Sequence, residues 1–243
     1  MRRLLVQGAS GRLGQTISRL AQQSDAWQVT ASEKDAPLEP LVATTEVSID
    51  VSVPEASVQI ASLCARYRKP LVIGTTGHSD AQMKAIESAA VSCPILVAPN
   101  FSVGVNLLFW LTRETAKVLG EAFDAEVIEM HHKLKKDAPS GTAKRIAEIL
   151  AGARSTMYEK AVRHGRQGMV GQRTPQEIGV HAVRGGSVVG EHTVVFAGEG
   201  ERIELIHRAA SRDTFARGAL QAAGWLLGQA PGRYDMQDVL GLR

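Results

Sequence analysis

The first fourteen residues constrain the fold of this chain more strongly than any other segment. The stretch Leu4-Leu5-Val6-Gln7 predicts a short buried strand, and apolar residues at helical spacing begin at Leu13. Between them lies a glycine-rich turn with the sequence Gly8-Ala9-Ser10-Gly11-Arg12-Leu13-Gly14. A strand, a glycine turn and a helix in this order direct backbone N–H groups and the positive end of a helix dipole toward an anion. We therefore predict that the pyrophosphate of a dinucleotide binds at Gly8, Ala9, Ser10, Gly11, Arg12 and Leu13, with a purely structural turn as the alternative.

A charged pair follows the second predicted strand. The segment Gln28–Ser32 is predicted to be extended, and it leads directly to Glu33 and Lys34. An acidic residue about 20 residues after the glycine turn is placed to accept hydrogen bonds from the adenosine ribose. A lysine beside it can pair with a 2′-phosphate, so the site suits NADPH as well as NADH. The alternative is an ordinary charged loop.

The composition of the 243 residues is that of a soluble globular protein, with 44% hydrophobic and 22% charged residues. The net charge of +3 suits anionic small molecules and gives no reason to expect a nucleic acid partner. Cys64 and Cys93 are isolated in the sequence, so we expect no disulfide and a cytoplasmic location. The sequence contains no run of about 20 apolar residues, which predicts that it does not span a membrane.

Strands and helices alternate through the first hundred residues. Further strands are predicted at Ser48–Val53, Pro70–Ile73 and Pro94–Ala98, and a helix capped by Ser79 or Asp80 at Asp80–Ala90. Such repeated units predict an α/β fold with a Rossmann-type, doubly wound parallel sheet. Ligands bind at the carboxyl ends of the strands in these sheets. The loops at those ends supply further candidates, although turn formation alone also explains their composition: Gly74, Thr75, Thr76, Ala98, Pro99, Asn100 and Phe101.

The pattern changes after residue 101. Helices are predicted at Val105–Leu119 and Ala143–Leu150, a strand at Ala125–Met130, and a long surface loop at 154–177. Three segments separated by glycine turns then have the pattern of antiparallel strands, and an amphipathic helix follows them: Ile178–Arg184, Val188–Phe196, Arg202–Ala209 and finally Thr214–Leu227. We predict a dinucleotide-binding domain formed by residues 1–101 and 213–243, and a second, α+β domain at 102–212.

The densest polar run extends from His131 to Thr142, between a predicted strand and a predicted helix. Ser140, Gly141 and Thr142 can offer backbone N–H groups and two hydroxyls to an anion, and the helix dipole adds to the attraction. His132 and the lysines bring positive charge nearby. His131 and Lys135 are titratable groups in this segment, and a lysine that is crowded by cations or partly buried releases its proton more readily.

Three other interpretations of this run stay open at this point: a solvated basic loop, an RNA-contacting patch and a His–His metal site. Adjacent histidines need a third metal ligand, and none is evident nearby, so we predict no metal. RNA-binding segments interleave aromatic with basic residues, which this run does not do. The residue types favour a site for an anionic small molecule.

Six motifs, spread in order over almost the whole chain, resemble those of the 4-hydroxy-tetrahydrodipicolinate reductase (dihydrodipicolinate reductase) family of bacterial lysine biosynthesis. They are the glycine turn at 8–14, Gly74–Gly77, Asn100–Asn106, Glu129–His132, Lys135–Thr142 and Val189–Thr193. Three departures concern the cofactor side. The stretch 35–49 is shorter than the family commonly shows, Pro99 replaces a small residue, and Val53 stands where an arginine can occur.

The resemblance implies an NAD(P)H-dependent oxidoreductase that reduces (4-hydroxy-)dihydrodipicolinate to tetrahydrodipicolinate on the route to diaminopimelate and lysine. By position, His131 matches the catalytic acid/base of the family and Lys135 its proton donor. The segments 74–76 and 98–101 match the nicotinamide end of the cofactor site. Contacts to the carboxylates of the substrate match His132, Gly141 and Thr142, with Ser140 beside them.

The resemblance also implies a homotetramer joined through the second domains. An alternative function is a Rossmann-type sensor that binds NAD(H) without turnover, or an inactive homologue. A sensor has no need of a proton donor beside an anion site, so the joint presence of His131, Lys135 and the turn at 140–142 favours the enzyme.

Overall fold

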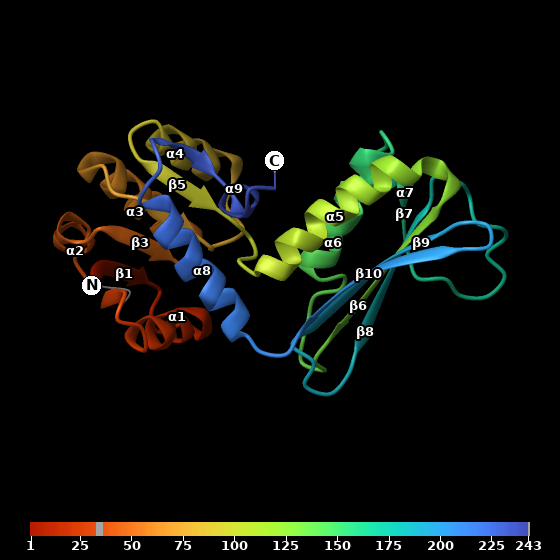
Figure 1. Cartoon of the computed structure of the whole chain (residues 1–243), viewed down its shortest axis with the longest axis horizontal. Helices are drawn as coiled ribbons and strands as arrows, with labels where there is room; N and C mark the ends of the chain where they lie inside the picture. The colour runs from red at the N-terminus through yellow and green to blue at the C-terminus, as the bar shows by residue number, and fades with distance from the viewer. Residues whose placement is uncertain (33–35, 243) are drawn as a thin grey trace. The chain divides into compact units, whose positions relative to one another are not determined.

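The computed structural model describes residues 1–32 and 36–242, so Glu33 and Lys34 lie outside the described residues. The chain forms two compact units (Figure 1). The first contains Met1–Val103 and the C-terminal segment that begins at Arg212, and the second contains Gly104–Ser211. Within the described residues, no helix combines the length and the apolar character that a membrane crossing requires.

A six-stranded sheet forms the centre of the first unit. Its strands run in the order β2-β1-β3-β4-β5-β11, and every neighbouring pair is parallel. The change of direction in strand order lies between β1 and β3, so the crevice of a doubly wound sheet opens at their carboxyl ends. The strands are β1 (Arg2–Gln7), β2 (Trp27–Ser32), β3 (Val47–Asp50), β4 (Leu71–Ile73), β5 (Pro94–Val97) and β11 (Gly232–Tyr234).

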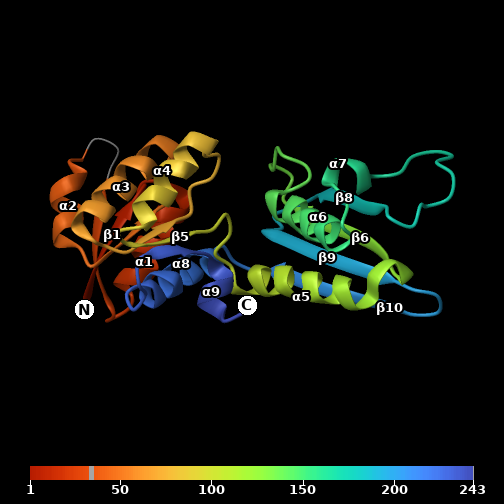
Figure 2. The ribbon, with the colours of Figure 1, turned by 90° about the horizontal axis from the view of Figure 1, so that it is seen from above.

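Helices cover both faces of this sheet, which confirms the predicted α/β, doubly wound architecture (Figure 2). Successive strand residues alternate between the two layers: Leu4 and Val6 pack with α1, α8 and α9, whereas Leu5 packs with α2, α3 and α4. The helices are α1 (Arg12–Gln22), α2 (Leu38–Thr44), α3 (Pro54–Tyr67), α4 (Asp80–Ala90), α8 (Asp213–Leu226) and α9 (Met236–Leu240).

Most predicted elements of the first unit are present, with differences at their ends. Helix α4 has the predicted bounds, and Ser79 and Gln82 form a capping box at its start. Strand β3 ends at Asp50, earlier than predicted, and Pro54 at the first position of α3 favours the helix start there. The short elements α2, β11 and α9 were not predicted, because segments of three to seven residues carry too little periodic pattern.

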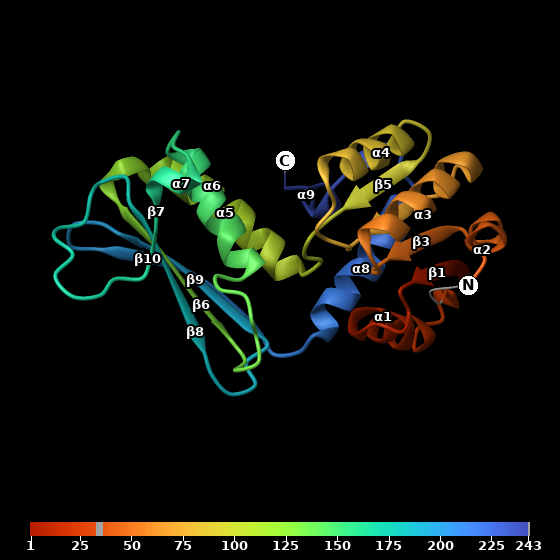
Figure 3. The same cartoon turned by 180° about the vertical axis from the view of Figure 1, so that it is seen from behind.

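The second unit is a five-stranded mixed sheet with two long helices against one face (Figure 3). The strand order is β10-β9-β6-β8-β7. The strands are β6 (Asp124–His131), β7 (Val162–His164), β8 (Ile178–Arg184), β9 (Gly190–Ala197) and β10 (Arg202–Ala209). The helices are α5 (Val103–Leu119), α6 (Gly141–Ala153) and the short α7 (Tyr158–Ala161), and a 3₁₀ turn at Gly120–Ala122 follows α5.

Two predictions for this unit were wrong in part. The segment 154–177 was predicted to be a loop, but it contains α7 and β7, and β7 extends the sheet beside β8. The three late strands were predicted to be antiparallel neighbours. Of these three strands, only β9 and β10 are antiparallel neighbours. Strand β6 lies between β8 and β9, so β8 does not pair with β9 and instead pairs in parallel with β6 and β7.

The face of this sheet opposite α5 and α6 exposes apolar side chains. Ile128, Val183 and Ile206 are 41%, 43% and 45% exposed. Ile128 on β6 and Ile206 on β10 belong to one row across the sheet, because both pair with Thr193 of β9. Strand residues that point to the other face of the sheet, such as Val127 and Val194, are buried against the helices.

Candidate active site

The glycine turn of the first unit has the backbone geometry that an anion site requires. Gly8 adopts the left-handed region with φ +80°, and a Cβ atom there would lie 2.7 Å from the carbonyl oxygen of Val51. A Cβ atom on Gly14 would lie 2.2 Å from the Gly8 oxygen. Gly11 occupies the N-cap position of α1, so no side chain caps the N–H groups at the start of this helix. The first turn of α1 also carries no acidic residue. The N-terminus of α1 is therefore suited to a phosphate group.

A buried carboxylate lies next to this turn. Asp50, at the end of β3, is fully buried and accepts four hydrogen bonds. The donors are the Ser52 N–H, the hydroxyls of Ser52 and Ser57, and the Thr75 hydroxyl at 2.8 Å. We call Asp50, Ser52, Ser57 and Thr75 the Asp50 cluster. It joins the loops after β3 and β4 to the start of α3, so it holds this edge of the sheet together.

The structure brings together two of the loops predicted to bind the nicotinamide end. A Cβ atom on Gly74 would lie 2.4 Å from the ring of Phe101, so the aromatic ring packs directly on the glycine. Phe101 is buried in the core beside α8, and Thr75 is buried in the Asp50 cluster. Thr76 and Pro99 are exposed, Ala98 is buried, and Asn100 is half-buried and accepts a hydrogen bond from the Ser102 N–H.

A pocket of about 610 Å³ opens at the carboxyl end of β1, between α2 and α3. Gln7 contributes to its lining and is 6% exposed. The side-chain oxygen of Gln7 is buried and has no hydrogen-bond partner among the described residues. A buried polar atom of this kind commonly faces a ligand or water that supplies the missing partner.

A second buried carboxylate lies in the other unit. Glu129 on β6 is fully buried, and its Oε2 atom accepts a hydrogen bond from His131 Nδ1 at 2.6 Å. Arg184 on β8 forms two hydrogen bonds of 2.8 Å, from Nη1 to Oε2 and from Nη2 to Oε1. The Ser140 N–H, at 3.0 Å, also donates to Oε1. Strand alternation explains the contact with His131, because residues two apart lie on one face of a strand.

Ser140 links this carboxylate to α6 and to another histidine. Its hydroxyl accepts a hydrogen bond from the Ala143 N–H and so caps α6, and it lies 3.1 Å from Nε2 of His192 on β9. The ring of His192 meets the edge of the His131 ring at 5.2 Å between centroids. We call Glu129, His131, Ser140, Arg184 and His192 the Glu129 cluster. The sequence predicted that the N–H and the hydroxyl of Ser140 face an anion, but both have partners within the protein.

The charges of the Glu129 cluster shift the pKa values of its members. Burial alone would raise the pKa of Glu129, but the hydrogen bonds from Arg184, His131 and Ser140 outweigh it and lower that pKa below its usual range. Burial lowers the pKa of His131, and the Glu129 carboxylate opposes this only in part. Burial also lowers the pKa of His192 to about 3, so this ring is neutral at physiological pH.

The loop after β6 carries the other predicted residues. Lys135 Nζ forms an ion pair with Asp137 at 3.0 Å, so a carboxylate lies beside the ammonium, where the sequence led us to expect cations. The ring atom Nδ1 of His132 is buried and lacks a hydrogen-bond partner among the described residues. Gly141 is exposed, with open space where a side chain would stand, and Thr142 is half-buried in the first turn of α6.

Four members of these clusters were not predicted from the sequence as site residues: Asp50, Glu129, Arg184 and His192. The alternation of β6 places Glu129 and His131 on one face, which is a signal that could have found Glu129. Arg184 and His192 reach the cluster only through the register of β6 with β8 and β9, in which His131 lies opposite Arg184 and Glu129 lies opposite His192. No local pattern reveals such pairings across 50 or so residues.

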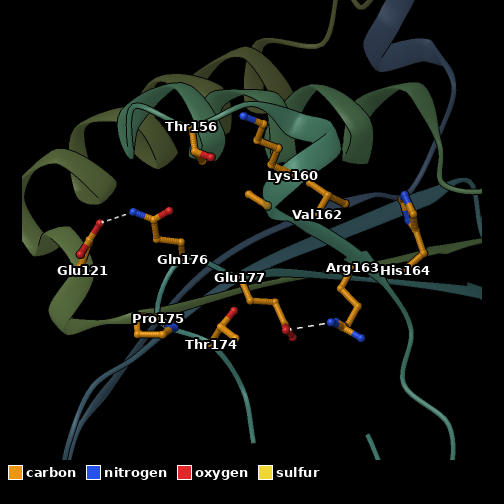
Figure 4. A pocket seen from close by; sticks show the side chains of 11 residues that line it. Glu121, Thr156, Lys160, Val162, Arg163, His164, Thr174, Pro175, Gln176 and Glu177 are labelled. Carbon is orange, nitrogen blue, oxygen red and sulfur yellow. Dashed lines mark hydrogen bonds and ion pairs between the residues drawn. The ribbon is translucent and has the colours of Figure 1, made fainter. Parts of the chain in front are cut away.

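A larger pocket in the second unit, of about 810 Å³, contains none of the described candidate residues (Figure 4). Four of its polar side chains bond to each other in pairs: Gln176 donates to Glu121 at 3.1 Å, and Arg163 forms an ion pair with Glu177 at 3.1 Å. We assign no ligand to this pocket.

The doubly wound sheet with its glycine turn is the architecture of a Rossmann-type dinucleotide-binding protein. Two family models match the chain: "Dihydrodipicolinate reductase, N-terminus" over residues 2–101 and "Dihydrodipicolinate reductase, C-terminus" over residues 104–240. The chain belongs to the dihydrodipicolinate reductase family.

Individual relatives agree with this assignment. The 4-hydroxy-tetrahydrodipicolinate reductase of Akkermansia muciniphila is 51% identical, with 98% of each chain covered. The enzyme of the same name from Syntrophotalea carbinolica is 45% identical, with 100% of each chain covered. A solved structure of dipicolinate-bound dihydrodipicolinate reductase from a Paenisporosarcina species has the same fold, with a TM-score of 0.81, 24% identity and 98% of each chain covered.

Proposed function

We propose that this chain reduces an unsaturated cyclic dicarboxylate of the dihydrodipicolinate type to tetrahydrodipicolinate, for diaminopimelate and lysine synthesis, and that the segment 131–142 supplies the proton. The name shared by its relatives supports the reaction. The observation that supports the site is the buried contact between His131 and Glu129 at 2.6 Å, on a strand that leads directly to Lys135 and the start of α6. Titratable groups and a helix N-terminus within one segment suit the protonation of a dianionic substrate.

His131 and Lys135 are the proposed catalytic residues. Reduction of a carbon–nitrogen double bond needs a proton as well as a hydride, so an acid must lie beside the reacting ring. Lys135 carries a proton on Nζ and is 21% exposed, and we assign it as the donor. His131, buried at the end of β6, is the acid/base that exchanges protons in the same site.

His132, Gly141 and Thr142 are the proposed contacts to the carboxylates of the substrate. Nδ1 of His132, which has no partner within 1–32 and 36–242, is available for a hydrogen bond, and the open space beside Gly141 leaves the N-terminus of α6 accessible. A helix of 13 residues supplies N–H groups and a dipole that attract an anion. Ser140 supports this turn from behind, because its own polar groups bind Glu129, Ala143 and His192.

The first unit is the proposed dinucleotide-binding domain. The glycine turn from Gly8 to Leu13 binds the pyrophosphate, and the pocket beside Gln7 takes the adenosine end. Glu33 and Lys34, which lie outside the described residues, are proposed to contact the ribose and a 2′-phosphate. We expect both NADPH and NADH to serve as cofactors.

The segments 74–76 and 98–101 are proposed to hold the nicotinamide end. Gly74 and Phe101 pack together at this edge of the sheet, and Thr76 and Pro99 are exposed there. The Asp50 cluster fixes the loop from below, since the Thr75 hydroxyl donates to Asp50. When bound, the cofactor supplies the hydride.

The second unit is the proposed substrate-binding and oligomerisation domain. A homotetramer would cover the row of exposed apolar residues that includes Ile128 and Ile206. We expect a tetramer in sedimentation velocity and smaller species for Ile128→Glu, and a wild-type monomer at all concentrations would contradict this proposal. Cys64 and Cys93 are free and buried, and we assign the enzyme to the cytoplasm, where cysteines stay reduced.

The loss of absorbance of NADPH or NADH on oxidation, with freshly generated substrate, tests the proposed function. Lys135→Ala should lower kcat by about 100-fold or more, because it removes a general acid. Cofactor affinity should stay unchanged, and Lys136→Ala, an exposed neighbour, should keep wild-type activity. Wild-type turnover in Lys135→Ala would remove the assigned role. Cofactor binding without any turnover by the wild-type protein would favour the sensor.

A further inference from the structure

The carboxylate of Glu129 accepts hydrogen bonds from two of the candidate residues, His131 and Ser140. Its Oε2 atom accepts from His131 Nδ1 at 2.6 Å and its Oε1 atom accepts from the Ser140 N–H at 3.0 Å. Arg184 donates to both oxygens at 2.8 Å. Four N–H donors therefore converge on a carboxylate with no exposed surface, and each of its two oxygens accepts two hydrogen bonds.

The chemistry of these partners determines which nitrogen of His131 carries a proton. A guanidinium group and a backbone N–H can only donate hydrogen bonds, so Glu129 must be the acceptor toward Arg184 and Ser140. An ionised carboxylate also accepts from His131, and Nδ1 must then be the donor. In the neutral ring, the single proton is consequently on Nδ1 and Nε2 has a free lone pair.

The Nε2 edge of the ring faces a different environment. A Cβ atom at Gly190 of β9 would lie 3.0 Å from Nε2, so glycine at this position leaves room for the ring edge. The ring of His192, on the same strand, contacts the His131 ring edge-on. The low pKa of His192 keeps it neutral, so it does not repel a protonated His131. The carboxylate therefore contacts one nitrogen and leaves the other for proton exchange.

We propose that Glu129, held by Arg184, is a positioning residue that keeps His131 in its Nδ1–H form and thereby reserves Nε2 for proton exchange with the substrate. The exchange itself rests on the proposed function, whereas the position of the proton in the free ring does not. Through the Ser140 N–H, the same carboxylate also fixes the start of the turn that leads into α6.

Glu129→Gln separates the charge of this residue from its shape. The amide oxygen must face Ser140 and one nitrogen of Arg184, because the opposite orientation would direct an NH₂ group at two fixed donors. The NH₂ group then replaces Oε2 and faces both Arg184 Nη1 and His131 Nδ1. Arg184 Nη1 cannot accept and must move away, whereas His131 Nδ1 can become an acceptor. The variant should therefore hold the ring in the opposite Nε2–H tautomer.

Among the residues that the structure describes, four charged or titratable groups face His131: Glu129 on its own strand, Arg184 on β8, His192 on β9 and Lys135 in the following loop. Only Glu129 among them stabilises the protonated ring by its charge. Glu129→Gln should therefore move the His131 limb of the pH–rate profile to lower pH. It should also lower kcat by about 100-fold while cofactor affinity is retained.

The test is ¹⁵N NMR of the NADPH-bound protein with ¹⁵N-labelled histidine, in which the ring shifts report the protonated nitrogen of each of the seven histidines. His131 is assigned by the loss of its signals in His131→Asn. In the wild-type protein above the pKa of the ring, we expect His131 to carry its proton on Nδ1. In Glu129→Gln, we expect the proton on Nε2.

The matched control is Glu126→Gln, since Glu126 on the same strand pairs with His181 at 2.8 Å. This variant should change the His181 signals and leave those of His131 unaltered. A wild-type His131 in the Nε2–H form would overturn the proposal even if Glu129→Gln failed to fold. An inactive wild-type protein with His131 in the Nδ1–H form would instead overturn the proposed function and leave the role of Glu129 intact.

Discussion

Each unit contains a strand carboxylate with no exposed surface, Asp50 on β3 and Glu129 on β6, and the two carboxylates differ in their partners. Asp50 in the first unit receives hydrogen bonds from three hydroxyls and one backbone N–H. Glu129 in the second unit receives them from a guanidinium group, an imidazole ring and one backbone N–H. Both are fully buried, so burial alone does not distinguish a structural carboxylate from one that acts in chemistry.

The two sets of partners differ in whether they can change from hydrogen-bond donor to acceptor. A hydroxyl donates or accepts by rotating, so the partners of Asp50 can adapt to a change in its proton or charge. Arg184 can only donate, so it keeps Glu129 ionised, and the charge in turn acts on His131. The Asp50 cluster therefore serves as a scaffold for loops, and the Glu129 cluster controls where a proton resides.

Arg184→Leu should have the largest effect on stability. It leaves the buried Glu129 carboxylate without its bidentate cation, and breaking a buried ion pair typically costs about 3 kcal/mol or more of unfolding free energy. Urea unfolding measures this loss. The exposed pair of Arg145 with Glu148 supplies the control, because Arg145→Leu should change stability by less than about 1 kcal/mol.

The double variant Glu129→Leu/Arg184→Leu sharpens this prediction. Replacement of both members by apolar side chains removes the uncompensated charge, so it should recover much of the stability lost in Arg184→Leu. Equal stability losses for Arg184→Leu and Arg145→Leu would show that Glu129 does not depend on its cation.

The second unit should lose stability at low pH, because its paired carboxylates become protonated there. Despite burial, which acts in the opposite direction, hydrogen bonds from Arg166, His181 and Arg173 lower the pKa of Glu126 from 4.5 to about 2. A pKa below the unfolded value contributes stability that is complete above about 4.5 and lost as the pH falls toward 2. Thermal unfolding over this range should show the loss, and Glu126→Gln should make it shallower. An unchanged slope in the variant would count against the ion-pair network.

Asp50→Asn should have the smallest effect, about 1 kcal/mol or less. Its NH₂ group can replace Oδ2, because the hydroxyls of Ser57 and Thr75 can rotate to accept. Asp50→Leu, which removes every acceptor, should cost about 3 kcal/mol by the same urea measurement. If Asp50→Asn were as destabilising as Asp50→Leu, the adaptable character of the cluster would be disproved.

The sequence predicted the parts of the molecule that local patterns encode. The glycine turn, the alternation of strands and helices, and the Ser79 cap each follow from a few adjacent residues. The run from His131 to Thr142 was found in the same way, because its chemistry is concentrated in twelve positions. The doubly wound sheet then follows from the repeated units.

The contacts that organise the candidate site were not predictable in this way. Arg184 reaches Glu129 only because β8 pairs in parallel with β6, and the sequence had suggested antiparallel neighbours. Ser140 has the type and position of an anion-binding residue, yet its N–H and hydroxyl are used within the protein. Both outcomes depend on strand order and register, which no single segment encodes.

The kcat values of Asp50→Asn and Glu129→Gln, compared at saturating cofactor and substrate, test the contrast between the two carboxylates most directly. We predict that Asp50→Asn stays within about threefold of the wild-type value, since its partners adapt. Glu129→Gln should fall by about 100-fold, because the proton moves to the wrong nitrogen of His131. Equal losses in the two variants would contradict the assignment of a scaffold role to one carboxylate and a proton-positioning role to the other.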